Sequence, residues 1–285
     1  MQSLQFEQSI SLLQKNGYNI FRCIDCRSAF LDINENFFNF ESFYQSYYKI
    51  DEKQEGYDNY FALENALKLT FQQRLNSIKK YFDNDPKEKK LLDIGCGPGF
   101  FLEESSKFFK SFGIEISKTA ANYIKNKLNL NVINKAFSAD LFKTEEFDVI
   151  TCWDTLEHLQ NPEKALSDIN KILNKKGLLI FTTGDFASIP ALITGKKWHL
   201  FNVPEHLFFF SKNGIIHLLK KTGFKPIHIS YPFAYYSLEY IAERIRKTFG
   251  VRIKLLPFFK KIIIPFNLFD IMCVICKKND EFIKQ

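Results

Sequence analysis

The chain has 285 residues, of which 46% are hydrophobic and 25% are charged, and its formal net charge is +7. This composition permits a sizeable folded core and excludes a disordered chain. The lysines are spread along the whole sequence, which favours a solvated basic surface over a nucleic-acid-binding patch.

The cysteine content and the hydropathy pattern indicate a reduced, non-secreted protein. Six cysteines are too few for a disulfide scaffold in a chain of this length. The N-terminus lacks a basic start and an apolar core, so we expect no signal peptide. No apolar run reaches membrane-spanning length. We therefore expect a cytoplasmic protein, peripheral at a membrane at most.

The N-terminal part of the chain predicts a small cap with one C-x-x-C pair, Cys23 and Cys26. A structural zinc site needs four protein ligands, and no further Cys or His occurs before the core. A second pair, Cys273 and Cys276, falls in a predicted buried strand, where residues three apart face opposite sides. We therefore expect no metal and interpret the first pair as a remnant of a zinc knuckle.

Two segments lead into the core. Residues 34–60 are rich in Phe and Tyr, which fits either a lid over an aromatic or amphipathic substrate or ordinary packing. Residues 61–82 carry apolar side chains at helical spacing, and Asp83 to Pro86 ends the pattern. The spacing predicts one helix before the first core strand.

A glycine-rich loop between two predicted strands is the clearest feature of the sequence. Strand 89–94 runs into the segment D-I-G-C-G-P-G, and strand 111–116 follows a short helix. Glycines lack a Cβ atom, so a ligand can lie against this backbone, and the N-terminus of the helix aims free N–H groups at it. Glu115 follows Gly95 by 20 residues and can accept hydrogen bonds from both hydroxyls of a ribose.

The spacing of the glycines in this loop narrows the class of ligand that it can bind. The glycines follow G-x-G-x-G rather than the G-x-G-x-x-G of a dinucleotide site, and Asp93 would repel a pyrophosphate but attract a cation. The segment resembles motif I of the class I S-adenosylmethionine-dependent methyltransferases. That resemblance implies S-adenosylmethionine as cofactor, bound by Asp93, Gly95, Cys96, Gly97, Gly99, Glu115 and Ile116.

The same resemblance implies the fold and the adenine contacts. It implies an α/β, Rossmann-like, seven-stranded, mostly parallel sheet with helices on both faces and an antiparallel last strand. Ser117 predicts an N-cap for a helix over 118–128, before a short strand near 131–133. By resemblance, Asp140 binds the adenine amino group and Leu141 packs on the ring. The alternative is that Asp140 is an ordinary turn residue.

The end of the fourth predicted strand carries polar residues. Strand 147–153 ends at Trp153 and is followed by D-T-L-E-H, which is similar to the same segment of the resembled family. Ligands in open α/β sheets lie beyond the carboxyl ends of the strands. We therefore expect Trp153 beside the cofactor, and Asp154 and Glu157 beside the acceptor.

The C-terminal half continues the pattern. Helix 163–173 is predicted to be capped by Gly177 before strand 178–183, and Ser211 predicts the N-cap of a helix over 212–222 that is closed by Gly223. The motifs P-E-H-L, F-S and T-G-F resemble small-molecule methyltransferases, including those of polysaccharide and quinone pathways. We expect Trp198 in the acceptor site.

The predicted domain organisation follows from these elements. An N-terminal cap spans 1–60 and a methyltransferase domain spans 61–285. Within that domain we expect a core over 88–232, a helical insertion over 233–266 and a final strand within 267–278. The insertion interleaves basic and apolar residues, which fits a packed helical cap, a dimer contact or an anionic membrane surface.

Two histidines are the candidates for catalysis. A sulfonium methyl donor is already activated, so the protein mainly positions the reactants, but an oxygen acceptor benefits from a base near neutral pH. His158 and His206 fit that role, and each equally fits a structural or orienting role.

Two absences disfavour nucleic acid as the acceptor. The segment after the fourth strand lacks the Pro-Pro motif of methylases that act on exocyclic amines of nucleic acids. The chain also has no Pro-Cys pair, which methylases of cytosine ring carbon use as nucleophile.

We therefore expect methylation, and O-methylation in particular, of a small-molecule, sugar or lipid-linked acceptor. Two alternatives stay open. One is an NAD-dependent oxidoreductase on a similar sheet, and the other is a non-catalytic nucleoside-binding module. The acceptor and the oligomeric state are not specified by the sequence.

Overall fold

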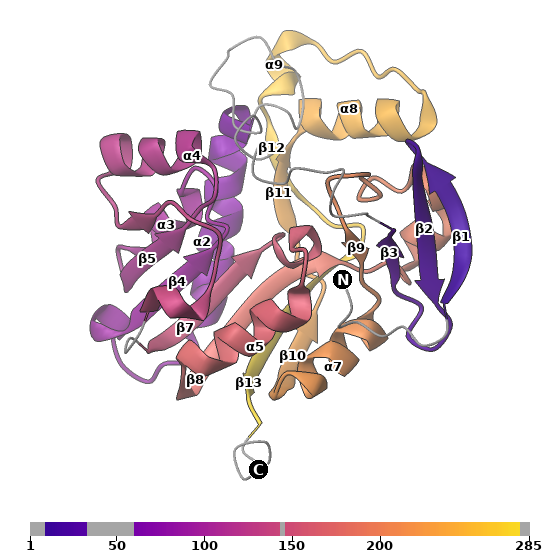
Figure 1. Cartoon of the computed structure of the whole chain (residues 1–285). Coiled ribbons are helices and arrows are strands. Elements are labelled where there is room, and N and C mark those ends of the chain that lie inside the picture. The colour runs from indigo at the N-terminus through magenta and orange to yellow at the C-terminus, as the bar shows by residue number, and fades with distance from the viewer. Residues whose placement is uncertain (1–8, 33–59, 143–145, 280–285) are drawn as a thin grey trace. The chain divides into compact units, whose positions relative to one another are not determined.

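The computed structural model describes residues 9–32, 60–142 and 146–279, so the lid expected over 34–60 lies outside the described residues except at Tyr60. These residues form sheets of four, seven and two strands (Figure 1). They group into two compact units. One takes in the described parts of 1–38, 137–232 and 268–285, and the other takes in the described parts of 39–136 and 233–267.

The seven-stranded sheet has the order β10-β13-β8-β7-β4-β5-β6. Its strands are β4 (Lys90–Ile94), β5 (Lys110–Ile114), β6 (Val132–Ile133), β7 (Phe147–Trp153), β8 (Leu173–Gly184), β10 (Phe224–Ser230) and β13 (Ile271–Lys278). Strand β5 pairs in parallel with β4 and β6, and β7 pairs in parallel with β8. Strand β13 is antiparallel to both β8 and β10. The predicted mostly parallel sheet with an antiparallel last strand is confirmed.

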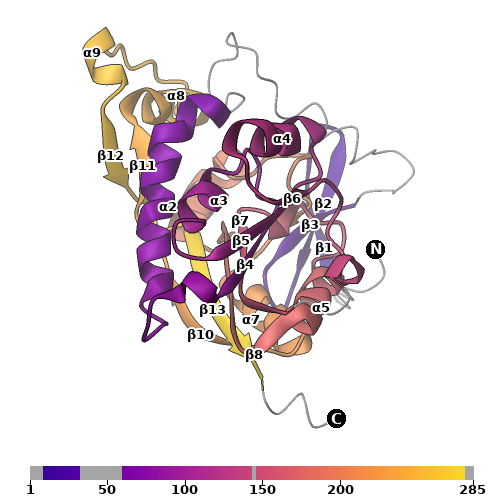
Figure 2. The same cartoon turned by 90° about the vertical axis from the view of Figure 1, so that its left-hand side faces the viewer.

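The unit that carries the glycine-rich loop packs helices beside β4, β5 and β6 (Figure 2). These elements are η2 (Tyr60–Leu63), α2 (Glu64–Lys79), η3 (Pro86–Glu88), α3 (Phe100–Ser105), α4 (Lys118–Tyr123) and the π-helical turn η4 (Ile124–Leu128). Helix α2 buries Phe71, whose ring meets the edge of Phe101 at a centroid distance of 5.5 Å. The Ser117 hydroxyl accepts from the Ala120 N–H, which confirms the predicted N-cap.

The other unit contains a four-stranded antiparallel sheet of β1 (Ser9–Lys15), β2 (Tyr18–Cys23), β3 (Ala29–Leu31) and β9 (Phe208–Phe209). Its remaining elements are η5 (Ala139–Phe142), η6 (Leu156–His158), α5 (Pro162–Ile172), α6 (Ile189–Thr194), η7 (Gly195–Lys197) and α7 (Lys212–Lys221). Ser211 caps α7 by accepting from the Gly214 N–H, as predicted.

The predicted cap at Gly177 is wrong. Helix α5 ends at Ile172, and β8 starts at Leu173, which already pairs with Phe147 in the sheet. Gly177 therefore lies inside the strand. A Cβ atom there would come within 2.8 Å of the Leu173 side chain. Close packing therefore explains the glycine at this position, and helix termination does not.

The insertion before the last strand is only partly helical. It contains α8 (Leu238–Phe249) and α9 (Pro257–Lys260), as expected. The antiparallel pair β11 (Ala234–Ser237) and β12 (Ile263–Phe266) encloses them and was not predicted. None of the described helices has both the length and the apolar character needed to cross a bilayer.

Gly99 fixes the start of α3, and its replacement by alanine is expected to destabilise the fold by about 2–5 kcal/mol. Its φ is +85°, and an added Cβ would lie 2.7 Å from the Ile124 side chain. Gly250 has a similar φ of +74° but open space around it. Urea unfolding of Gly99→Ala and Gly250→Ala measures both effects. Equal losses of unfolding free energy in the two variants would contradict the close contact at Gly99.

Candidate functional site

The glycine-rich loop is a tight turn fastened to the end of β5. Gly95 and Gly97 have φ values of 70° and 53°, in the left-handed region that favours glycine. The N–H groups of Gly95 and Cys96 both donate to the Ile114 carbonyl, at 2.9 and 3.1 Å. The loop therefore keeps its backbone beside the residue that precedes Glu115.

Glu115 is held against this loop by backbone donors. Its side chain is buried, its Oε2 accepts from the Gly97 N–H at 2.8 Å, and its Oε1 accepts from the Ser117 N–H at 2.7 Å. Burial raises the pKa of Glu115, and hydrogen bonds from the backbone of Ser117, Gly97 and Ile116 oppose that shift. A carboxylate oxygen can accept more than one hydrogen bond, so this group can still accept from a ligand.

Asn134 holds the end of the same strand, and sequence reasoning missed it. Its amide Nδ2 donates to the backbone carbonyls of Glu115 and Ile116, at 2.8 and 3.0 Å. Asn134 follows β6, the neighbour of β5 in the sheet. An isolated asparagine after a two-residue strand carries no signal that could have identified this role.

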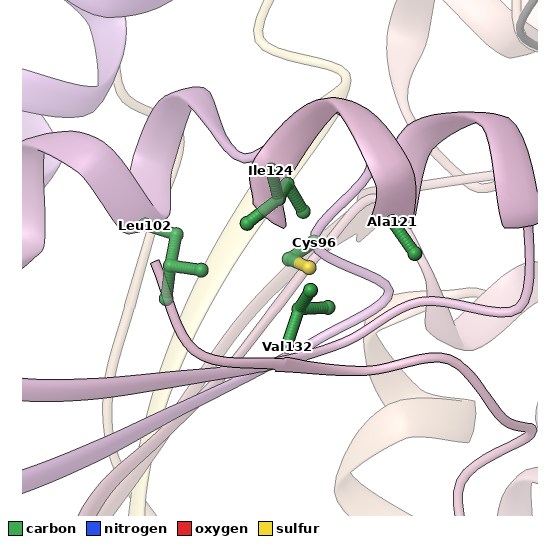
Figure 3. Close-up of a cluster of buried hydrophobic side chains, with 5 residues drawn as sticks. All are labelled: Cys96, Leu102, Ala121, Ile124 and Val132. Atoms are coloured by element: carbon green, nitrogen blue, oxygen red, sulfur yellow. The ribbon is translucent and has the colours of Figure 1, made fainter. Parts of the chain in front are cut away.

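Cys96 points its thiol away from the loop and into the core. Figure 3 shows its sulfur among Leu102, Ala121, Ile124 and Val132. Burial raises the pKa of the thiol well above its usual value, and the charges of Glu115 and Asp93 raise it further. Cys96 therefore stays protonated, and its backbone is the part available to the cofactor contact expected for it.

The end of β7 carries an unusual backbone conformation. Asp154 has a φ of 48°, in the left-handed region, and its N–H donates to the Thr182 hydroxyl at 3.0 Å. The Thr155 hydroxyl donates to the Trp153 carbonyl at 3.0 Å. Such conformations cost energy in a non-glycine residue and cluster at functional sites. The turn leads directly into η6, which carries Glu157 and His158.

Glu157, His158 and His206 form one side-chain cluster. One ligand atom from each lies within 4.8 Å of the others. The two imidazole rings are nearly perpendicular, with centroids 4.6 Å apart. The Leu207 N–H donates to the Glu157 carbonyl at 2.9 Å, which ties the segment carrying His206 to the end of β7. The structure thus brings the two histidines singled out in the sequence to one place.

Hydrogen bonding defines the state of His158. Its Nδ1 lies 3.0 Å from the Glu205 backbone carbonyl, which can only accept, so Nδ1 carries the proton and Nε2 keeps its lone pair. Burial lowers the pKa of His158, and the nearby carboxylates oppose the shift. The imidazole is therefore neutral near pH 7 and can accept a proton or bind a cation.

Glu157 is the buried acid of the cluster. Only 4% of its surface is exposed, and Oε2 accepts no hydrogen bond from any residue within the described ranges. Burial first and the charge of Asp154 second raise the pKa of Glu157 to about 8, while a hydrogen bond with Thr183 opposes the shift. Near pH 7 the cluster offers this carboxyl group beside two imidazoles.

Trp198 lies beside the same cluster. Its indole Nε1 donates to Asp270 Oδ2 at 2.8 Å, and His199 Nε2 contacts the same oxygen at 2.8 Å. A small cavity is lined by Glu157, Thr183, Gly184, Trp198, Leu200, His206, Phe208 and Phe209. Two residues expected at the acceptor site, Trp198 and Glu157, thus share a cavity with His206. Sequence reasoning missed Asp270, which orients the indole.

The N-terminal sheet anchors the segment that carries His206. The Leu31 N–H donates to the Leu207 carbonyl at 2.9 Å, and Asn16 Nδ2 donates to the Val203 carbonyl at 2.8 Å. Lys15 Nζ donates to the Phe201 carbonyl at 2.6 Å. The peptide bond between Val203 and Pro204 is cis. The position of His206 therefore depends on residues far away in the sequence.

Asp140 makes the local contacts of a turn residue. It lies exposed in η5, its Oδ2 accepts from the Ser138 hydroxyl at 3.1 Å, and its N–H donates to that hydroxyl oxygen at 3.3 Å. Leu141 follows it and is half-buried. The adenine contacts expected for this pair stay a prediction.

Comparison with known proteins places these features in a family. A family model described as a methyltransferase domain matches residues 68–229. An uncharacterised protein of Methanocaldococcus jannaschii is 31% identical over 62% of this chain and 81% of its own length. A ubiquinone biosynthesis O-methyltransferase of Glaesserella parasuis is 31% identical over an aligned region that covers 48% of this chain and 66% of that enzyme.

Solved structures agree on the fold. A plantazolicin methyltransferase in complex with S-adenosylhomocysteine has a TM-score of 0.54 and 19% identity, covering 84% of this chain and 95% of that one. A methyltransferase of Thermotoga maritima, described as S-adenosylmethionine-dependent and a possible histamine N-methyltransferase, has a TM-score of 0.51 and 19% identity, covering 77% and 93%. At such identities the likeness shows the fold alone.

Proposed function

This chain belongs to the methyltransferase domain family, and we propose that it transfers a methyl group from S-adenosylmethionine to a hydroxyl oxygen of a small-molecule acceptor. Dependence on S-adenosylmethionine follows from the family, which sets aside the nicotinamide-dependent and non-catalytic alternatives. The atom that receives the methyl group and the roles of the individual residues are what we propose. The observation that carries it is the cluster of Glu157, His158 and His206.

The cofactor residues fit an adenosyl sulfonium. When bound, S-adenosylmethionine supplies an electrophilic methyl group on a positively charged sulfur. The charges of Glu115 and Asp93 raise the pKa of the Cys96 thiol, so the loop is electrically negative. A negative loop attracts a cation and repels a pyrophosphate. Glu115 is proposed to accept from the ribose hydroxyls, and Gly95 and Gly97 to allow close approach of the ligand.

The remaining cofactor contacts are proposed from the resemblance. Asp140 and Leu141 are assigned to the adenine, while Ile116 and Trp153 are assigned to the walls around the adenosyl group. Gly99 supports this site indirectly, because its close contact is with the side chain of Ile124. Cys96 contributes backbone only, since its thiol belongs to the apolar cluster.

The histidine cluster is proposed to prepare the acceptor. A hydroxyl group is a weak nucleophile until its proton moves to a base. The Nε2 lone pair of His158 and the imidazole of His206 are the candidate proton acceptors. Asp154 and Glu157 are proposed to orient the hydroxyl group, with Trp198 as an apolar wall. In the transfer, the acceptor oxygen bonds to the methyl carbon while the carbon–sulfur bond breaks.

The relatives support the acceptor class. The Glaesserella relative is named as an O-methyltransferase of ubiquinone biosynthesis, so oxygen on a small-molecule acceptor is the first class to test. The test is transfer of labelled methyl from S-adenosylmethionine into fractionated metabolites, followed by mass spectrometry of the product. We expect an O-methylated small molecule. Label in protein or nucleic acid only, or on nitrogen or carbon, would contradict the proposal.

The domain boundaries are proposed as the sequence predicts them, with a cap over 1–60 and the methyltransferase domain after it. The described part of the cap contributes strands β1, β2 and β3, and β3 pairs with β9 in the same sheet. Its hydrogen bonds to Phe201, Val203 and Leu207 support the proposal that the cap holds the acceptor side of the site.

We also propose that the insertion touches an anionic membrane surface. Between 44% and 79% of each of six apolar side chains is exposed: Phe249, Val251, Ile253, Leu256, Phe258 and Phe259. Exposed basic residues interleave with them: Arg246, Lys247, Arg252, Lys254, Lys260 and Lys261. The apolar side chains can insert among the lipid acyl chains, and the basic side chains can bind the anionic headgroups.

Vesicle binding tests this surface. The protein is expected to sediment with vesicles containing phosphatidylglycerol and to be released by high salt, because the basic residues lose their attraction when screened. Phe258→Asp is expected to weaken sedimentation, whereas Ile10→Asp, an exposed apolar residue of β1, is a matched control. Equal binding of all three proteins, or no binding, would contradict the membrane proposal.

A further inference from the structure

We infer that Glu157, His158 and His206 bind one divalent transition-metal ion, for which Zn²⁺ and Mn²⁺ are the probes. The same side chains are candidates for proton acceptors and orienting groups, and the sequence alone predicts no metal. The geometry of the three side chains is that of a ligand set. Binding of the ion stands on this geometry alone, while its role in catalysis rests on the proposed O-methylation.

His158 is oriented as metal-binding histidines are. Such a histidine donates its other ring N–H to a carboxylate or a backbone carbonyl, which fixes the tautomer and directs the free nitrogen at the ion. Here Nδ1 lies 3.0 Å from the Glu205 carbonyl, and Nε2 is left with its lone pair. The ligand would therefore be pre-oriented before the metal arrives.

Glu157 supplies the second observation. Its side chain is 4% exposed, and Oε2 lacks a hydrogen-bond donor among the residues that the structure describes. A buried carboxyl oxygen without a donor destabilises the fold. A cation held between this oxygen and the imidazole nitrogens removes that cost, and the exposed Asp154 lies close enough to add negative charge.

The spacing of the three ligands needs little adjustment. Their ligand atoms lie within 4.8 Å of one another. Ligands about 2.0–2.2 Å from a common ion lie about 3.5 Å apart in a tetrahedron, so small side-chain rotations close the set. Glu157 and His158 are adjacent on η6, and a backbone hydrogen bond from Leu207 to Glu157 fixes the distance to His206.

The ligand types select the ion. Two imidazole nitrogens and one carboxylate oxygen suit Zn²⁺, Mn²⁺ and their first-row neighbours, whereas Mg²⁺ and Ca²⁺ prefer oxygen ligands throughout. Three protein ligands also leave a coordination position open, which is the arrangement of catalytic rather than structural metal sites.

The open position can take the hydroxyl oxygen of the acceptor. Coordination lowers the pKa of a bound hydroxyl group, so its proton leaves to solvent and the oxygen becomes a nucleophile. That oxygen then bonds to the methyl carbon, and the carbon–sulfur bond electrons stay on sulfur. The products are the methyl ether and S-adenosylhomocysteine. The histidines would then act as ligands rather than as the base.

Metal binding is measured on the full chain after treatment with a chelator and dialysis. We expect one equivalent of Zn²⁺ or Mn²⁺ to bind in calorimetry, at least about 100-fold more weakly in His206→Ala and Glu157→Gln. His217→Ala, an exposed histidine on α7, is the matched control and is expected to bind as the unaltered chain does. Co²⁺ absorption gives a second readout, because its visible bands report nitrogen ligands and are expected to change in His206→Ala.

Retained binding of S-adenosylhomocysteine shows that each variant is folded. No stoichiometric binding to the unaltered chain, or equal affinity in all variants, overturns the metal site. Full methyl transfer by the metal-free protein overturns its catalytic role but leaves the proposed O-methylation standing. Metal binding with transfer to nitrogen or carbon has the opposite meaning: the site stands, and the proposed function fails.

Discussion

Glu115→Ala is expected to weaken the binding of S-adenosylhomocysteine by at least about 100-fold. The carboxylate is proposed to accept from two ribose hydroxyls, and each hydrogen bond to a charged group contributes about 1.5–3 kcal/mol. A difference of about 1.4 kcal/mol changes an equilibrium constant tenfold. The alanine variant also leaves the Gly97 N–H without its acceptor, which loosens the loop. Isothermal titration calorimetry measures the change.

The control for this variant is Glu88→Ala in the same unit. Glu88 is exposed and pairs with Lys110 at the surface, so its removal is expected to leave affinity unchanged. The wild-type affinity is also expected to fall from neutral to mildly acidic pH, because burial raises the pKa of Glu115 and the protonated form accepts less well. Glu115→Gln is expected to lose most of that pH dependence. An unchanged affinity in Glu115→Ala would exclude the ribose contact.

His206→Ala and His158→Ala are each expected to lower kcat by about 100-fold to 10,000-fold, the range for loss of a positioned acid–base group. Both side chains belong to the cluster at the end of β7, so a proton acceptor or a ligand is lost in either variant. Affinity for S-adenosylhomocysteine is expected to stay within about twofold. Initial rates at saturating acceptor, with calorimetry on the same preparations, measure both quantities.

His217→Ala and His228→Ala serve as controls, because both residues are exposed. Their kcat values are expected to equal that of the unaltered chain. Wild-type turnover in both His158→Ala and His206→Ala would remove the cluster from the reaction. A loss of turnover accompanied by a loss of cofactor binding would instead indicate a folding defect, which urea unfolding detects.

The features that sequence predicts well are those encoded locally. The glycine-rich loop joins β4 to α3, and Glu115 follows β5 directly, so spacing along the chain places both. Ser117 and Ser211 cap their helices as expected, since capping depends on the next three residues. His206 is 48 residues from His158 and was singled out only through a motif resemblance.

The features that sequence did not predict depend on distant partners. Asp270 precedes β13 and orients Trp198, 72 residues earlier. Strand β9 joins β3 across most of the chain, and β11 pairs with β12 around two helices. The wrong cap at Gly177 has the same origin, because the pairing of Leu173 with Phe147 ends the helix before the local sequence would.

A crystal structure of this chain determined with S-adenosylhomocysteine would test the cofactor site most directly. The proposed site predicts electron density for the adenosyl group against Gly95 and Gly97, with both ribose hydroxyls within hydrogen-bonding distance of the Glu115 carboxylate. Density at another place, or a ribose that does not contact Glu115, would contradict it.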